Sequence, residues 1–389
     1  MVGVEVEVVR ATLVIGIVLS GLVFHFTRLS SGGVVTTPFL ALLVMTGRWQ
    51  DIAGWAVIAL IGVAAIRLVA ARWPLPRPWL FYCGVFTTTA IHVIGIEASG
   101  SDTAWSFIGE FSLFLAAGLY VCSGLTAYDA VRQGIFRTFA AAAVVTAVTV
   151  AVMQGVRFLT INFGGPQAMV MQSPLNDPVL AVICVGMAAA MRVGPRWGTA
   201  GIIGSLYLLN IASWQSLLVV VVFTLAGAGI YRVIADSLGL SPKERFYALL
   251  AVGSIASWFG LFWAQYLGIP GAAEVAAYAV EPLIVIGLMI GETARYGIAR
   301  TAAGSLVVYA VTAGAAAVIA QRPEATGFVV AAAMALVAGI IGVSLIRIRR
   351  EWAIALAAGD KWGVAPGNLS DVVTPETRIG ESAGPRTRE

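Results

Sequence analysis

Two pairs of oppositely charged residues stand at matching places in an otherwise apolar chain. Asp129 and Arg132 lie in the segment GLTAYDAVRQGIFRT, and Glu292 and Arg295 lie in GLMIGETARYGIART, which begins 163 residues later. Each acid precedes its arginine by three residues, a spacing that places both side chains on one face of a helix. The guanidinium fork of arginine matches a carboxylate, so these residues suit ion pairing or the binding of an anionic ligand.

A second arginine follows each pair, Arg137 in the first segment and Arg300 in the second. Both are expected at the start of a helix, where the helix dipole disfavours a cation. One interpretation is that these arginines anchor loops to the cytoplasmic face of a membrane. The other is a cytoplasmic mouth that faces an anionic substrate or the acidic surface of a partner, lined by Arg132, Arg137, Arg295 and Arg300.

Four more charged residues lie within apolar segments. Arg67 and Arg232 recur 165 residues apart near the ends of their segments, where a long side chain can reach the interface. Glu110 and Glu281 do not align with each other, but acids inside a membrane segment are functional candidates. We therefore group these arginines with the four above as candidate residues for binding an anionic substrate or a partner, supported by the acids Asp129, Glu292, Glu110 and Glu281.

The composition identifies the elements that must position these side chains. The chain has 389 residues, of which 59% are hydrophobic and 11% are charged, with a net charge of +4. A soluble domain has about 25% charged residues, so this chain cannot cover a globule with charge. We expect an all-α, polytopic membrane protein in contact with the lipid bilayer, with about thirteen transmembrane helices.

The orientation follows from the basic residues, all but two of which are arginine. They gather after alternate apolar segments if two short ones, at 33–47 and 199–212, are counted as spanning rather than re-entrant. Cytoplasmic loops carry such an excess, so we expect the N-terminus outside and the C-terminus in the cytoplasm. The same distribution argues against a nucleic-acid partner, because these charges lie between membrane segments.

Other dipeptides also recur. Trp49-Gln50 and Phe81-Tyr82 return as Trp214-Gln215 and Phe246-Tyr247, each 165 residues later. We expect two parallel six-helix repeats, an arrangement found in membrane transport folds. The C-terminal segment at 351–389 has too few apolar residues to offset the entropy that a chain loses when it becomes ordered. The predicted organisation is a first repeat at 1–160, a second repeat at 175–325, a further transmembrane helix at 326–350 and a disordered cytoplasmic tail at 351–389.

The segment GLTAYDAVRQG resembles a sequence block of the PgsC/CapC family, the membrane subunit of bacterial poly-γ-glutamate synthase. The matching residues are Gly124, Leu125, Ala127, Arg132, Gln133 and Gly134. The segment GVVTTPFLALL, from Gly33, is similar to another block of that family. The chain departs from the pattern where Thr37-Pro38 replaces the usual Pro-Gly, and where Ile290 and Tyr296 occupy the second-copy positions of Ala127 and Gln133. The chain therefore resembles a tandem duplication of one family unit.

The resemblance implies a role in the bacterial plasma membrane. The membrane subunit of this family partners a cytoplasmic PgsB/CapB-like ligase, which uses ATP, and a PgsA/CapA-like extracytoplasmic subunit. It serves as scaffold or conduit for the polyanionic polymer, and the chain itself would be a non-catalytic subunit without a cofactor. The sequence agrees, because it has no phosphate-binding loop, no H-E-x-x-H and no Cys/His cluster, and so suggests neither catalytic residues nor a metal site. An arginine-lined entry would concentrate a polycarboxylate by electrostatic attraction.

The sequence leaves another class open. A stand-alone secondary transporter with parallel repeats would account for the duplication and for Glu110, Glu281 and Arg67, and it would contain broken helices near the membrane centre. A membrane glycosyltransferase would need a large polar outside loop, and the expected outside loops at 97–103 and 158–177 are too short for one.

Overall fold

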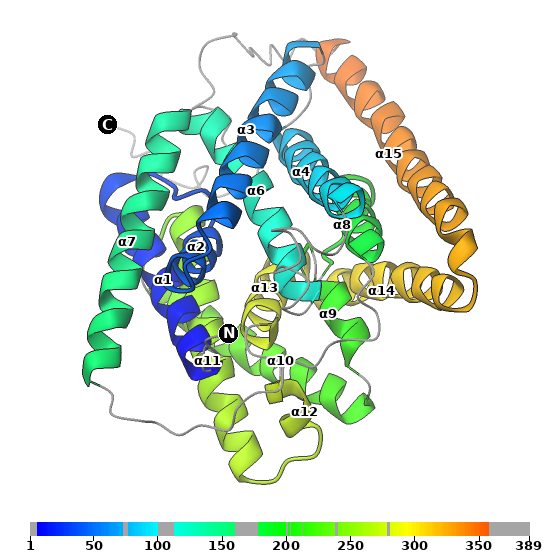
Figure 1. Cartoon of the computed structure of the whole chain (residues 1–389). Helices are drawn as coiled ribbons and strands as arrows, with labels where there is room; N and C mark the ends of the chain where they lie inside the picture. The colour runs from blue at the N-terminus through cyan, green and yellow to red at the C-terminus, as the bar shows by residue number, and fades with distance from the viewer. Residues whose placement is uncertain are drawn as a thin grey trace, which may run out of the picture. The chain divides into compact units, whose positions relative to one another are not determined.

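The computed structural model describes residues 6–72, 77–99, 113–159, 178–199, 201–202, 204–211, 213–237, 240–277 and 281–357, and every regular element in these ranges is a helix (Figure 1). The first set of helices is α1 (Val6–Thr27), α2 (Thr36–Met45), α3 (Trp49–Arg72), α4 (Arg77–Ser99), α6 (Leu113–Gln133) and α7 (Ile135–Leu159). The second set is α8 (Pro178–Val193), α9 (Gly204–Asn210), α10 (Trp214–Ser237), α11 (Pro242–Tyr266), α12 (Ala272–Ala277), α13 (Glu281–Tyr296) and α14 (Ile298–Gln321). A 3-10 turn, Pro323–Ala325, then precedes α15 (Thr326–Ala357).

Seven of the described helices are long and apolar enough to cross a membrane: α1, α3, α7, α10, α11, α14 and α15. Large apolar side chains such as Leu218, Phe262 and Leu306 are exposed on their surfaces. Such a surface suits lipid, because a helix satisfies its backbone polar groups internally. The prediction of an all-α membrane protein is confirmed, while the count of thirteen spans stays a prediction.

Two apolar segments form half-length helices. α2 has ten residues and α9 has seven. At 1.5 Å per residue these helices measure about 15 Å or less, roughly half of the hydrocarbon core of a bilayer. Neither crosses the core as a helix by itself, which differs from the count that treated 33–47 and 199–212 as spans. Gly33 and Gly201, both with positive φ, precede the two helices and make the required turns.

The apolar segment near 275–291 is divided between α12 and α13. Arg10 of α1 is buried and donates a 2.6 Å hydrogen bond to the carbonyl of Ala276, at the end of α12. This carbonyl is one of the groups that a helix end leaves unsatisfied. Glu7 holds Arg10 at 2.7 Å and accepts a hydrogen bond from Trp258 of α11. The contact therefore ties the end of α12 to both α1 and α11.

Glycines allow two helix pairs to approach closely, α4 with α6 and α11 with α13. A Cβ atom added at Gly124 would lie 2.4 Å from the Cα atom of Val85. One added at Gly253 would lie 2.8 Å from the Cα atom of Gly287. Small residues at helix contacts are a common means of packing in membranes, where water does not drive helices together.

The two sets of helices also pack crosswise. α3, α4 and α6 pack against one another, and so do α10, α11 and α13. α1 of the first set packs against α11 of the second, while α8 of the second packs against α4 of the first. α7 lies against α1 and α2, and α14 lies against α8 and α9. All these contacts lie in one compact unit that extends to Ser344.

The last helix ends later than the sequence suggested. α15 continues to Ala357, past the predicted boundary at residue 350. The segment EWAIALA, which extends the helix, consists largely of residues with high helix propensity. The predicted disordered tail at 351–389 therefore begins within a helix, and its remainder, 358–389, lies outside the described residues.

Candidate functional site

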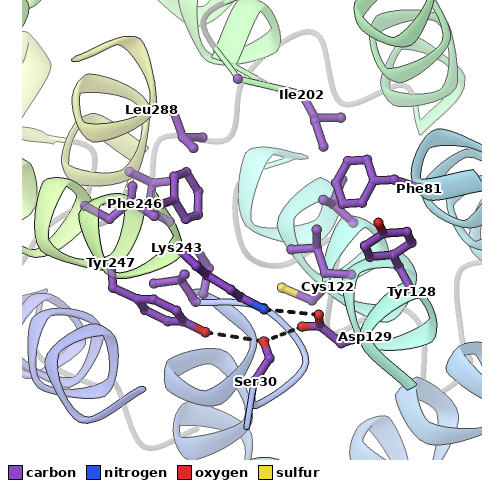
Figure 2. A pocket seen from close by; sticks show the side chains of 18 of the residues that line it. Ser30, Phe81, Cys122, Tyr128, Asp129, Ile202, Lys243, Phe246, Tyr247 and Leu288 are labelled. Carbon is purple, nitrogen blue, oxygen red and sulfur yellow. Dashed lines mark hydrogen bonds and ion pairs between the residues drawn. The ribbon is translucent and has the colours of Figure 1, made fainter. Parts of the chain in front are cut away.

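A cavity of about 290 Å³ lies between the two sets of helices (Figure 2). Its lining comes from α2, α4, α6, α8, α11 and α13, and from the loops before α2 and α9. Most of the lining residues are apolar, and several come in pairs that the sequence comparison matched. These pairs are Phe81 and Phe246, and Leu125 and Leu288. Five charged side chains complete the lining: Asp129, Arg132, Arg192, Lys243 and Glu292.

The first polar cluster is centred on Asp129 of α6, which is 6% exposed. One carboxylate oxygen accepts a hydrogen bond from the hydroxyl of Ser30, and the other lies 3.4 Å from Nζ of Lys243. The Ser30 hydroxyl also lies 3.3 Å from the hydroxyl of Tyr247. Figure 2 shows these side chains converging at one end of the cavity. The cluster joins α6, α11 and the loop after α1.

The start of α11 fixes the position of Lys243. Ser241 and Glu244 form a capping box, in which the Glu244 carboxylate accepts a 2.9 Å hydrogen bond from the backbone N–H of Ser241. The other carboxylate oxygen of Glu244 lies 2.7 Å from the guanidinium of Arg28 and 2.8 Å from a ring nitrogen of His25. These contacts hold the first turn of α11 against the end of α1, so that Lys243 faces the cavity.

The second polar cluster is a buried ion pair between Arg192 of α8 and Glu292 of α13. Their side chains are 10% and 13% exposed, and the nearest atoms are 2.5 Å apart. Arg192 also donates to the hydroxyl of Tyr82 at 2.9 Å and to the hydroxyl of Thr199 at 3.1 Å. The guanidinium is therefore held from three sides. Buried pairs of this kind have a large desolvation cost and need good geometry.

The cations of the cavity differ in how fully they are paired. The Lys243 side chain is 28% exposed, and its ion pair with Asp129 is long at 3.4 Å. Arg132 is exposed, lines the cavity and forms no ion pair within the part of the chain that the structure describes. Both acids, in contrast, are already paired. The side chains at this end of the cavity that can still gain an ionic partner, Lys243 and Arg132, are cations. The site therefore favours an anionic group.

The structure brings together three of the residues that the sequence singled out. Asp129, Arg132 and Glu292 line the cavity. The two acids pair with cations of distant helices and not with the arginines of their own segments. Four predicted arginines are exposed and lie apart from the lining: Arg67, Arg137, Arg295 and Arg300. Of the four arginines that were expected to line a cytoplasmic mouth, Arg132 lines this cavity.

Three further predicted residues fall in less defined places. The helices α10 and α13 contain Arg232 and Glu281, but their side chains lie outside the described part of the structure. Glu110 also lies outside the described residues. Within the described ranges, no group of three or more His, Cys, Asp or Glu side chains is placed to hold a metal ion.

Sequence reasoning missed four polar residues of the site: Ser30, Arg192, Lys243 and Tyr247. It used Arg192 and Lys243 only to orient the chain in the membrane. The signal for Tyr247 was present, because Phe81-Tyr82 recurs as Phe246-Tyr247. Both tyrosines have hydroxyl contacts in the clusters of the cavity, at Arg192 and at Ser30.

Comparisons of the chain with protein-family models, with curated proteins and with solved structures found no match.

Proposed function

We propose that this chain is the membrane subunit of a poly-γ-glutamate synthesis and export complex, in which it is scaffold or conduit for the polymer. The observation that supports the proposal most directly is the position of GLTAYDAVRQG, the segment that resembles the PgsC/CapC family. Asp129 and Arg132 of that segment, and Glu292 of its second copy, line one cavity. The open cations there, Arg132 and Lys243, suit a polymer that carries a carboxylate on every unit.

The proposal includes a duplicated unit with two parallel repeats. The crosswise helix contacts support it, since each set supplies equivalent helices to the packing. Local geometry supports it as well. A Cβ atom on Gly33 would meet Leu125, and one on Gly201 would meet Leu288, which are the matching residues of the two segments.

In this proposal the polar end of the cavity faces the cytoplasm. It is formed at the ends of α6, α8 and α13 and at the start of α11, next to the arginine-rich connections of the predicted topology. A cytoplasmic PgsB/CapB-like ligase would supply nascent polymer from that side. A PgsA/CapA-like subunit would receive it outside the bacterial plasma membrane.

One observation favours a second candidate, a stand-alone secondary transporter. The half-length helices α2 and α9, and the division between α12 and α13, are comparable to the discontinuous helices that line transporter sites. Such a transporter would move a small substrate through the same cavity without a ligase partner.

The two candidates differ in their partners, so purification from the native membrane separates them. The protein, tagged at its C-terminus, is isolated in mild detergent, and the eluate is tested for ATP-dependent incorporation of glutamate into γ-linked polymer. A tagged polytopic membrane protein of similar size is the control. Co-purification of a ligase and synthesis of polymer support the synthase subunit. An inert protein without a ligase overturns it, and uptake by proteoliposomes then tests the transporter.

A further inference from the structure

The five charged groups of the cavity fall into two classes. Arg192 and one oxygen of Glu292 form a nearly buried ion pair, and Tyr82 and Thr199 also accept hydrogen bonds from Arg192. Lys243 has a long ion pair with Asp129 and lies 5.0 Å from the centre of the Phe24 ring, and Arg132 is free of ion pairs among the described residues. A ligand can therefore gain contacts at Lys243 and Arg132 without breaking the buried pair.

We propose that Lys243 and Arg132 bind one carboxylate of a ligand unit, and that Lys243 exchanges its contact with Asp129 for this carboxylate. The identity of that unit as a glutamyl residue rests on the proposed function, whereas the carboxylate site itself does not. Asp129 keeps its hydrogen bond from Ser30 while Lys243 moves. It therefore acts as a resting partner, which holds the lysine in place between binding events.

The charges of the site favour a single carboxylate. Lys243, Arg132 and Asp129 together carry one net positive charge, which a monoanion neutralises. A phosphate dianion would leave an excess negative charge beside the Asp129 carboxylate, and like charges in a partly buried site repel strongly. The planar fork of Arg132 also matches a carboxylate with two parallel hydrogen bonds.

The rest of the cavity restricts what the carboxylate can be attached to. Next to the polar end the lining is aromatic or aliphatic, and it includes Phe81, Phe246, Leu125 and Leu288. A polar group buried there without a hydrogen bond would be unfavourable. A hydrocarbon stem fits this lining. In a γ-linked glutamyl unit the free carboxylate is bonded to Cα, which also carries the amide nitrogen, and the two methylene groups follow Cα.

The second set of helices does not form a second carboxylate site like that of Lys243 and Arg132. Arg295, which matches Arg132, is exposed, and its guanidinium lies 5.3 Å from the centre of the Tyr296 ring. Arg192 is fully engaged with Glu292. The cavity therefore offers one carboxylate position, and a polymer would pass it one unit at a time.

Calorimetric titration of the whole protein in lipid nanodiscs tests the proposal. The probes are butyrate, a monocarboxylate on a hydrocarbon stem, a γ-linked glutamate trimer, and inorganic phosphate as the competing anion. Hydrogen bonds to charged groups contribute about 1.5–3 kcal/mol, so Lys243→Met and Arg132→Gln should each weaken binding of butyrate and trimer about tenfold or more. Asp129→Asn should strengthen binding several-fold, because Lys243 loses its competing partner.

The matched control is Arg245→Gln. Arg245 carries the same charge in the same turn of α11, but it is exposed, lies outside the lining and donates to the carbonyl of Leu240. This variant should bind both probes as the unaltered protein does. Unchanged affinity in Lys243→Met, or tighter binding of phosphate than of butyrate, overturns the proposal. If Lys243→Met fails to fold, the gain expected from Asp129→Asn decides.

The outcomes also separate this site from the proposed function. If butyrate binds and the variants respond as expected, but no ligase co-purifies with the protein, the carboxylate site is supported and the role as a synthase subunit is ruled out. Polymer synthesis by a co-purified ligase, together with unchanged affinity in the Lys243 and Arg132 variants, supports the synthase and removes the site.

Discussion

At the scale of single residues, the buried pair of Arg192 and Glu292 is the contact whose loss should harm the fold most. One oxygen of Glu292 is bonded to Arg192, and the other is buried without a hydrogen-bond partner among the described residues. Removal of Arg192 would leave the buried carboxylate of Glu292 without a counter-ion.

We expect Arg192→Met to destabilise the protein by about 3–5 kcal/mol, the usual cost of removing one partner of a buried pair. Thermal unfolding in detergent measures this effect. The double variant Arg192→Met with Glu292→Gln should recover much of the loss, because it removes the unpaired charge. If the two substitutions act additively, the pair is not a coupled unit.

The sequence located the acids of the site but not the residues that bind them. Asp129 and Glu292 were visible because their segments repeat. Their cations come from other helices, Lys243 at a separation of 114 residues and Arg192 at 100. Such partners depend on how helices pack, and the pattern within one segment contains no information about that.

At the scale of helices, the close approach of α4 and α6 depends on Gly124. A Cβ atom there would lie 2.4 Å from the Cα atom of Val85 and 2.8 Å from the hydroxyl of Thr88. Backbone atoms cannot move aside as the end of a flexible side chain can. The two helices would have to separate.

Gly124→Ala should therefore destabilise the protein by about 1–3 kcal/mol, as overpacking of a core does. Gly314→Ala, within α14, is the matched control, because a Cβ atom there meets nothing within 4 Å. It should be neutral or stabilise by up to about 1 kcal/mol through helix propensity. Equal melting temperatures of the two variants would contradict the role assigned to Gly124.

The junction between α13 and α14 needs glycine for a different reason. Gly297 has φ 85° and ψ 157°, a conformation essentially restricted to glycine, and a Cβ atom there would meet no neighbour. Gly297→Ala should cost about 1–3 kcal/mol through backbone strain alone. Circular dichroism during thermal unfolding measures the loss, and an unchanged melting temperature would show that the turn tolerates a side chain.

Helix existence could be predicted from apolar segments, and two boundaries from Gly134 and Gly297. The shortness of the segments that contain α2 and α9 was also visible in the sequence, but the residues at which these helices begin and end were not. Hydropathy reports how apolar a segment is, but not where its backbone turns. The segment at 33–47 is mostly apolar, yet its helix ends at Met45, before Gly47 with φ 72°.

At the scale of the molecule, charged contacts link the two sets of helices. Arg28 binds Glu244, and Asp129 binds Lys243. If the chain is cut between α7 and α8 and both parts are produced together, we expect them to co-purify as one complex. Arg28→Gln combined with Asp129→Asn should lower the fraction of the second part retained by the first. Full retention by the double variant would assign the association to the remaining polar contacts and the apolar packing between the two sets.

The same long separations affect how the chain is made. Arg28 and Asp129 meet their partners 216 and 114 residues later, in the first turn of α11. While the chain is being inserted, neither Arg28 nor Asp129 can form its contact with α11 until α11 has been synthesised. A chain that terminates before α11 would lack both partners, and Asp129, which is buried in the folded protein, would be left without the cation of Lys243.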